Sequence, residues 1–116
     1  MTMTEDLGYA AFNAYVVCAL WASGEEFDNY SIDDLAAETY ITMKSDVENF
    51  VRENSADLAG LDSEQVGHDF WLTRNGHGAG FWDRGLGKLG VRLTAATKHY
   101  GEQSLYVGGD GKLYLD

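Results

Sequence analysis

The sequence predicts an α+β fold: a mainly helical single domain of three to five helices that ends in an antiparallel β-hairpin. Three observations support this prediction. Apolar residues recur at helical spacing through most of the chain, the residues from 104 to 115 alternate with period two around glycines, and no proline is present. With 116 residues, of which 45% are hydrophobic, the chain can bury one core and its size does not require two. We expect one globular domain over residues 1–116, with an acidic helical half (1–60) and a second half (61–116).

The first helix is predicted from about residue 5 to residue 22. Its inward stripe at helical spacing consists of Tyr9, Phe12, Val16, Ala19 and Leu20. The pair Ser23-Gly24 ends the helix. Cys18 lies among apolar neighbours, so we expect a small buried residue rather than a nucleophile.

A second helix is predicted to begin at Ser31, because its hydroxyl can accept from a backbone N–H at the helix start and Asp34 favours the positive helix end. Its apolar face continues to about residue 54 through Ile32, Leu35, Ala36, Thr39, Met43, Val47, Phe50 and Val51. Residues 39–42 are β-branched and aromatic, which lowers helix propensity, so one long helix and two shorter ones both remain open.

A short third helix is predicted after Asp62, which acts as N-cap with Gln65 completing the capping box. Val66, Phe70 and Thr73 face inward from it, and Asn75-Gly76 ends it. The fourth helical pattern consists of Leu86, Leu89, Val91 or Leu93, Ala96 and Tyr100, and Gly101 closes it. Three glycines near its start each cost up to about 1 kcal/mol, so its end is better defined than its start.

The β-hairpin pairs residues 104–107 with residues 112–115 around the turn 108–111. An isolated hairpin is only marginally stable in water, so one of its faces must pack on the helices. That face is either the aliphatic side or the tyrosine side. The aliphatic side consists of Leu105, Val107, Leu113 and Leu115.

The negative charge of the chain is concentrated in one segment. Residues 25–69 contain thirteen Asp and Glu against Lys44 and Arg52, a net charge of −11, and the remaining residues sum to zero. A local negative potential repels phosphate and attracts basic surfaces. We therefore expect no direct binding of nucleic acid, and instead a protein partner whose own surface is basic and binds nucleic acid.

Eight carboxylates are the predicted contacts with that partner: Asp28, Asp33, Asp34, Glu38, Asp46, Glu48, Glu53 and Asp57. Spaced along helices, they can imitate the charge of a nucleic-acid backbone and compete for a basic groove. The alternative is an ordinary solvated surface. A salt-adapted protein is not indicated, because the last 47 residues carry six bases against four acids.

No membrane association is expected. The longest apolar run, residues 15–22, is far shorter than the roughly 20 residues of a bilayer span. Glu5 and Asp6 lie where a signal peptide needs positive charge, so we expect a soluble, intracellular protein.

The segment from His68 to Gly85 reads HDFWLTRNGHGAGFWDRG. It resembles a motif of small, mostly uncharacterised proteins from bacteriophages and phage-derived genomes, in which a helix and a terminal hairpin follow. The resemblance covers about residues 60–116. It implies a phage or mobile-element origin, and small accessory proteins of that origin often blunt host defences such as restriction or CRISPR systems. The implied location is the cytoplasm of the host cell.

The motif also has a physical interpretation. Its alternating glycines favour either a binding loop or a tight turn that packs Phe81 and Trp82 against Phe70 and Trp71, and we favour the turn because a small domain needs its aromatic residues in the core. An acid of the motif and an arginine are expected to form a planar two-bond pair, chosen from Asp69 or Asp83 with Arg74 or Arg84. The motif-loop residues singled out are His68, Asp69, Arg74, Asn75, His77, Asp83 and Arg84.

Three functions from different classes follow. The first is a phage-encoded anti-defence inhibitor, such as an anti-CRISPR protein, that acts as a nucleic-acid mimic without a cofactor. The second is a small structural or regulatory phage protein that binds a partner through the Gly-aromatic motif. The third is a small metal-dependent hydrolase that uses His68 and His77, with Asp69, Asp83 and Glu64 as further candidate ligands. It is the least indicated of the three, because the spacing of these ligands matches no known metal motif. We expect neither catalytic residues nor a metal.

Overall fold

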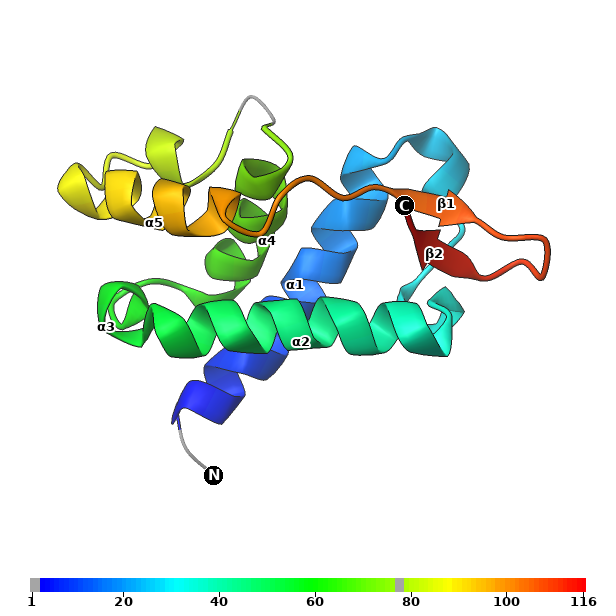
Figure 1. The fold of residues 1–116 in the computed structure, drawn as a ribbon, viewed down its shortest axis with the longest axis horizontal. Helices are drawn as coiled ribbons and strands as arrows, with labels where there is room; N and C mark the ends of the chain where they lie inside the picture. Colours follow the sequence, from blue (N-terminus) through cyan, green and yellow to red (C-terminus); the bar gives the residue numbers. More distant parts are fainter. Residues whose placement is uncertain (1–2, 77–78) are drawn as a thin grey trace.

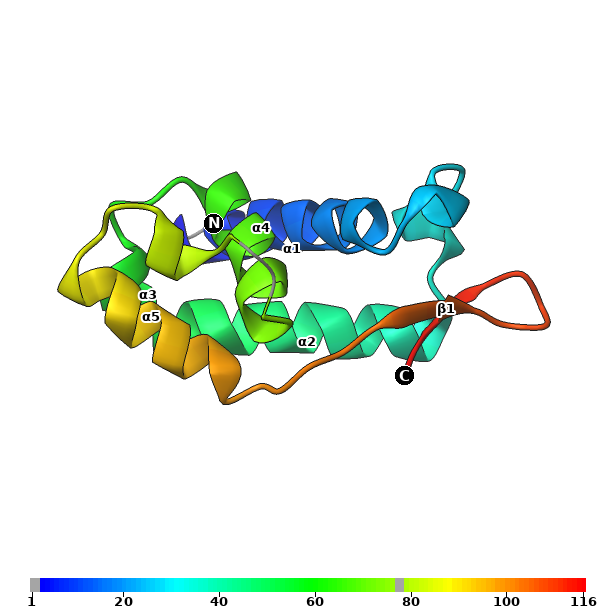
Figure 2. The same ribbon diagram turned by 90° about the horizontal axis from the view of Figure 1, so that it is seen from above.

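Helix α1 (Met3–Ala22) packs along α4 (Ser63–Arg74), and α2 (Ala37–Glu53) crosses α1 in a second layer (Figures 1 and 2). The computed structural model describes residues 3–76 and 79–116, with side chains from residue 9 onward. The shorter helices are η1 (Glu25–Phe27), η2 (Ile32–Asp34), α3 (Ser55–Leu58), η3 (Phe81–Asp83) and α5 (Lys88–Lys98). The strands are β1 (Leu105–Val107) and β2 (Leu113–Leu115). The predicted α+β fold, mainly helical with a C-terminal hairpin, is confirmed.

Helix α1 buries one side, but not the whole predicted stripe. Phe12 and Val16 are buried as predicted, and so are Ala19 and Leu20, whereas Tyr9 is 66% exposed. The prediction for Tyr9 was wrong because the buried side is centred on residues such as Tyr15, which faces α4. Within the described residues, no helix is both long enough and apolar enough to span a membrane.

The second helix begins later than predicted. Ser31 does form a capping box, with its hydroxyl accepting from Asp33 N at 3.2 Å and its own N–H donating to Asp34 at 2.8 Å. That box starts only the single turn η2. The chain then extends at Leu35, because the N–H of Ala36 donates to the carbonyl of Leu113 in β2 at 3.0 Å. Helix α2 therefore starts at Ala37, and it runs as one helix through residues 39–42.

Helix α4 matches its prediction closely. Asp62 is the N-cap and accepts from the backbone N–H of Gln65 at 3.1 Å. The side chain of Gln65 does not return to the cap, as a capping box requires, but donates to Asp69 at 2.9 Å. The predicted inward residues are all buried: Val66, Phe70 and Thr73.

The structure of α5 shows which of Val91 and Leu93 faces the core. Leu93 is fully buried whereas Val91 is 70% exposed, so the inward stripe passes through Leu93. The helix ends before Gly101, whose φ of +78° is the left-handed conformation that glycine adopts without strain.

The hairpin packs its aliphatic side on the helices. Leu105 pairs with Leu115, and Val107 with Leu113, in antiparallel register. Leu105 and Leu113 are buried and Leu115 is half-buried, which confirms the aliphatic side, but Val107 is 41% exposed although its partner Leu113 is fully buried.

Aromatic rings fill the core between α2, α4 and η3. Phe50 stacks on Phe70 with ring centroids 4.3 Å apart, and Phe81 lies 5.7 Å from Phe50. Trp71 meets Tyr15 edge to face at 5.3 Å. These contacts confirm that Phe70, Trp71 and Phe81 anchor the core.

Trp82 is the exception among the predicted core aromatics, because 51% of it is exposed. It follows Phe81 directly in the single turn η3, and consecutive residues of a helical turn point in different directions. With Phe81 inward, Trp82 therefore faces solvent.

We expect the Cys18 thiol to be unreactive in the folded protein. Cys18 is fully buried in α1, and burial, with the nearby charge of Asp69 as a second cause, raises the pKa of the thiol to about 12. Ellman's reagent at pH 8 should label less than a tenth of the native protein over an hour, and all of the protein in guanidinium chloride. Rapid stoichiometric labelling of the native chain would contradict this burial.

Candidate functional site

The segment that contains η1 and η2 lies at the end of the molecule that carries the hairpin (Figure 1), and this end is rich in carboxylates. We call it the acidic end and define it by five exposed carboxylates in η1, η2 and their flanks and in the first turn of α2: Glu25, Glu26, Asp28, Asp33 and Glu38. In the part of the chain that the structure describes, none of these five side chains forms an ion pair. No ion pair with a described residue therefore neutralises the charge of the acidic end.

Short local structures hold these carboxylates outward. Helix η1 follows Gly24, whose φ of +118° turns the chain after α1, and it is anchored by buried Phe27. Helix η2 is anchored by the residue that follows it, Leu35, which is buried beside β2. With the apolar residue of each turn facing the core, the acidic neighbours point into solvent.

Asp34 and Asp57, two of the eight predicted contacts, are bonded within the chain. Asp34 accepts from the backbone N–H of Ser31 in the capping box of η2. Asp57 pairs with Arg92 at 2.9 Å, and the hydrogen bonds from this guanidinium hold the pKa of the carboxyl below its usual range. Asp34 therefore caps a helical turn, and Asp57 joins α3 to α5.

Asp46 has a structural role instead of facing a partner. It pairs at 2.9 Å with Arg74, whose side chain is only 2% exposed, and the same guanidinium nitrogen donates to the hydroxyl of Tyr15 at 2.9 Å. The other nitrogens of Arg74 donate to the carbonyls of Tyr100 and Gly101 at 2.9 Å and 2.8 Å. We call this cluster the Arg74 hub, because it joins α1, α2, α4 and the end of α5.

Glu48 and Glu53 lie further along α2, away from the acidic end. Glu48 is exposed, whereas Glu53 accepts from the hydroxyl of Tyr100 at 2.9 Å. Partial burial and this hydrogen bond raise the pKa of Tyr100. Of the eight predicted contacts, the acidic end therefore includes Asp28, Asp33 and Glu38.

Glu25 and Glu26 were not among the predicted contacts, although both contribute to the net charge of residues 25–69. A signal was available, since both follow the predicted helix end at Ser23-Gly24 and so had to lie in a surface turn.

The predicted planar pair in the motif is formed by Arg84 and Asp69. Arg84 donates from Nε and Nη2 to the carboxylate at 2.7–3.2 Å, while Gln65 donates to the same group at 2.9 Å. Asp69 is buried, and its hydrogen bonds raise the pKa of Arg84. The pair fixes the motif segment to α4, whereas Asp83 is exposed and outside it.

Other motif residues hold the segment in place. The hydroxyl of Thr73 accepts from the N–H of Phe81 at 3.1 Å, and a Cβ on Gly80 would overlap that hydroxyl. Asn75 accepts from the N–H of Gln103 at 2.8 Å, which connects the end of α4 to the segment before β1. His77 lies outside the described residues.

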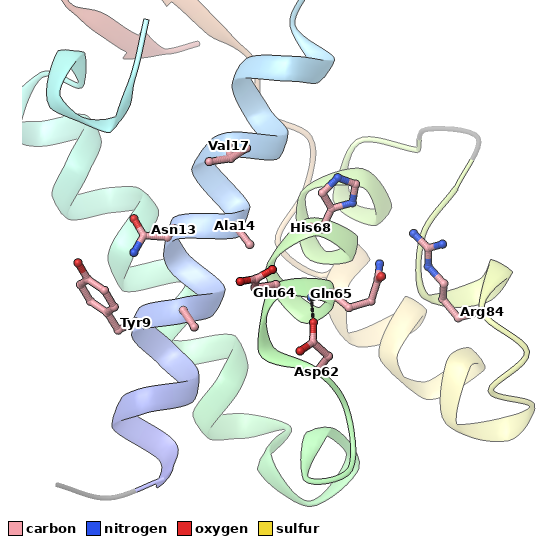
Figure 3. Close-up of a pocket in the computed structure, with 10 residues that line it drawn as sticks. Tyr9, Asn13, Ala14, Val17, Asp62, Glu64, Gln65, His68 and Arg84 are labelled. Atoms are coloured by element: carbon pink, nitrogen blue, oxygen red, sulfur yellow. Dashed lines mark hydrogen bonds between the residues drawn. The ribbon is translucent and has the colours of Figure 1, made fainter.

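The predicted ligands of a metal-dependent hydrolase do not converge in the residues that the structure describes. His68 lies on α4 and lines an open hollow with Glu64 (Figure 3). The oxygens of Asp69 are bonded to Arg84 and Gln65 instead of facing that hollow. No group of three or more His, Cys, Asp or Glu suited to a metal occurs in residues 3–76 and 79–116.

Comparisons of the chain with protein-family models, with curated proteins and with solved structures found no match. The functional evidence is therefore the geometry of this chain. The motif is mainly a structural element, and the acidic end is a surface with charge available for a partner.

Proposed function

We propose that the protein is an inhibitor without enzymatic activity that binds a basic, nucleic-acid-handling protein through its acidic end. The observation that carries the proposal is the group of five exposed carboxylates, none of which pairs with a base among the described residues. A surface of this charge competes with nucleic acid for a basic groove, since either one displaces the anions that surround the basic residues of the groove. It repels nucleic acid itself.

The biological setting of the proposal is phage defence. The resemblance of residues 60–116 to small phage proteins favours an anti-defence inhibitor, such as an anti-CRISPR protein, in the cytoplasm of a bacterial host. A nucleic-acid-binding effector of the host presents the basic groove that the proposal requires.

The distribution of charge supports binding through one end rather than along α2. Asp46 is tied to Arg74, and Asp57 to Arg92, so their charges are already paired. At the acidic end, Asp33 lines a hollow with Lys112 but forms no ion pair with it within the described part of the chain. A basic partner would therefore meet its strongest attraction at the acidic end.

Neutralising part of the acidic end is expected to weaken capture of the partner. The test variant is Glu25→Gln, Asp28→Asn, Asp33→Asn, and the immobilised protein is exposed to host lysate at low and at high salt. The parent should retain a nucleic-acid-binding protein that an added oligonucleotide releases, and its capture should fall steeply with salt. The variant should capture several-fold less, chiefly because association is slower.

The control removes the same number of charges elsewhere. Glu48→Gln, Asp83→Asn, Glu102→Gln alters three exposed carboxylates outside the acidic end and should capture as much as the parent. Equal capture by the test variant at both salts, with no release by the oligonucleotide, would refute the proposal. Capture that instead depends on Trp82 would favour binding through the Gly-aromatic motif.

A further inference from the structure

The outer side of α1 carries large apolar side chains in water. Tyr9, Asn13, Val17 and Trp21 follow one another at intervals of four residues and so form a single stripe, which we call the α1 ridge. Tyr9, Val17 and Trp21 are 66%, 64% and 72% exposed. Because the opposite side of α1 is also apolar and is packed in the core, this helix is hydrophobic on two sides. Helices of that kind are normally covered on both.

Open hollows flank the α1 ridge. On one side, a hollow of about 780 Å³ lies between α1 and α4 and is lined by Ala14, Val17 and His68 among others (Figure 3). On the other side, a hollow of about 330 Å³ between α1 and η1–η2 is lined by Trp21, Phe27 and others. The ridge runs from residue 9 to residue 21, a rise of about 18 Å along the helix. This length and shape fit about three turns of a second helix.

Carboxylates line both hollows. Asp62 and Glu64 line the hollow next to α4, and Asp28 lines the one next to η1 and η2. The base at the first hollow, Arg84, is already paired with Asp69, and Lys112 shares a further hollow beside Tyr9 with Asp33. An occupant of the ridge therefore meets apolar contacts at its centre and negative charge along both edges.

We propose that the α1 ridge binds an amphipathic helix whose apolar face is flanked by Lys and Arg. Apolar side chains at the i, i+3, i+4 and i+7 positions would pack on Val17 and Trp21, and the basic residues would face the carboxylates. The inference rests on the proposed function, since it assigns this helix to the same basic partner. It adds a contact surface and a partner element that the acidic end alone does not specify.

The charge distribution argues against a second copy of the chain as the occupant. A two-fold dimer through the ridge would bring the same patch of both chains together. Asp28 and Glu64 of one chain would then face carboxylates of the second chain, and each chain carries a net charge of −11. Like charges placed together oppose association, whereas a basic helix removes the repulsion.

Two synthetic peptides of 14 residues test the proposal, both built from the same numbers of Leu and Lys. One has its leucines on a single helical face, and the other has them distributed around the helix. Isothermal titration at about 0.15 M salt should show that the parent binds the amphipathic peptide about tenfold more tightly or better. Equal affinity for the two peptides, or no binding of the amphipathic one, would overturn the inference.

Matched variants locate the binding. Val17→Ser, Trp21→Ser changes the ridge and should weaken binding of the amphipathic peptide at least about tenfold. The control Val91→Ser, Trp82→Ser removes similarly exposed side chains elsewhere, 70% and 51% exposed, and should bind as the parent does. Circular dichroism should show both variants folded. Equal affinity of the two variants would overturn the inference, as would a parent that sediments as a dimer and a ridge variant that sediments as a monomer.

The two proposals fail separately in this design. Peptide binding that is lost in the Glu25→Gln, Asp28→Asn, Asp33→Asn variant but retained in the ridge variant would overturn the inference and leave the proposed function standing. Binding that depends on the ridge, together with lysate capture that an oligonucleotide does not release, would support the inference and refute nucleic-acid mimicry.

Discussion

Replacing Gly67 with alanine is expected to destabilise the fold by about 3 kcal/mol or more. Gly67 lies on α4 where this helix crosses α1, and it is buried. An added Cβ would overlap the carbonyl oxygen of Ala11 and lie 2.9 Å from the backbone nitrogen of Tyr15. Both obstacles are backbone atoms of a helix, so relief requires α1 and α4 to separate and the core to loosen.

Thermal and urea unfolding, followed by circular dichroism, measure this effect. Gly60→Ala is the matched control, because a Cβ at Gly60 meets no heavy atom within 4 Å. The control should unfold near the parent, whereas Gly67→Ala should lose a large part of the roughly 5–15 kcal/mol that holds a typical domain together. Equal midpoints for the two variants would show that the helices do not cross as closely as described.

Replacing Arg74 with alanine is expected to cost about 3 kcal/mol. The change removes four hydrogen bonds, which leaves the carboxylate of Asp46 and the hydroxyl of Tyr15 without their partner. It also removes the guanidinium that lies 5.6 Å from the ring of Phe70. The Tyr15 hydroxyl is buried and the Asp46 carboxylate is partly buried, so water replaces their lost partner only incompletely.

Arg92→Ala is the control for the Arg74 hub, because it breaks an ion pair at the surface. Arg92 is largely exposed, and the pairing of exposed charges adds little to stability. Arg74→Lys should fall between the parent and Arg74→Ala, since lysine keeps the charge near Asp46 but not the planar set of donors. If Arg74→Ala unfolds at the same urea concentration as Arg92→Ala, the hub does not stabilise the fold.

Local signals predicted the elements that depend on local chemistry. The N-cap at Asp62 and the turn at Asn75-Gly76 predicted both ends of α4 correctly, because a capping side chain can start a helix and a glycine turn can end one. The hairpin was equally visible from its alternation and its glycines. Ser31 also capped a helix as predicted, but β2 drew residues 35 and 36 out of it, and that contact joins distant parts of the chain.

What could not be predicted depends on which elements meet. Tyr9 and Trp82 are as hydrophobic as the buried aromatics, and only the positions of α4 and η3 decide that they lie outside. Gly67 is unfavourable for an isolated helix, and only a crossing helix explains it. At the candidate site, counting charges located the acidic segment but did not reveal that Arg74 neutralises Asp46.

The long-range contacts of the chain bear on the order in which it is made. When residues 1–60 have left a ribosome, most of the negative charge has been delivered, but α1 still lacks α4 as its packing partner. The Arg74 hub cannot form until Tyr100 and Gly101 have been synthesised, because Arg74 donates to their carbonyls. Residues 35 and 36 likewise cannot contact β2 before Leu113 has been made. Folding is therefore expected to follow synthesis rather than accompany it. During that interval the mutual repulsion of the carboxylates is expected to keep unfinished chains, with their uncovered apolar helices, from associating with one another.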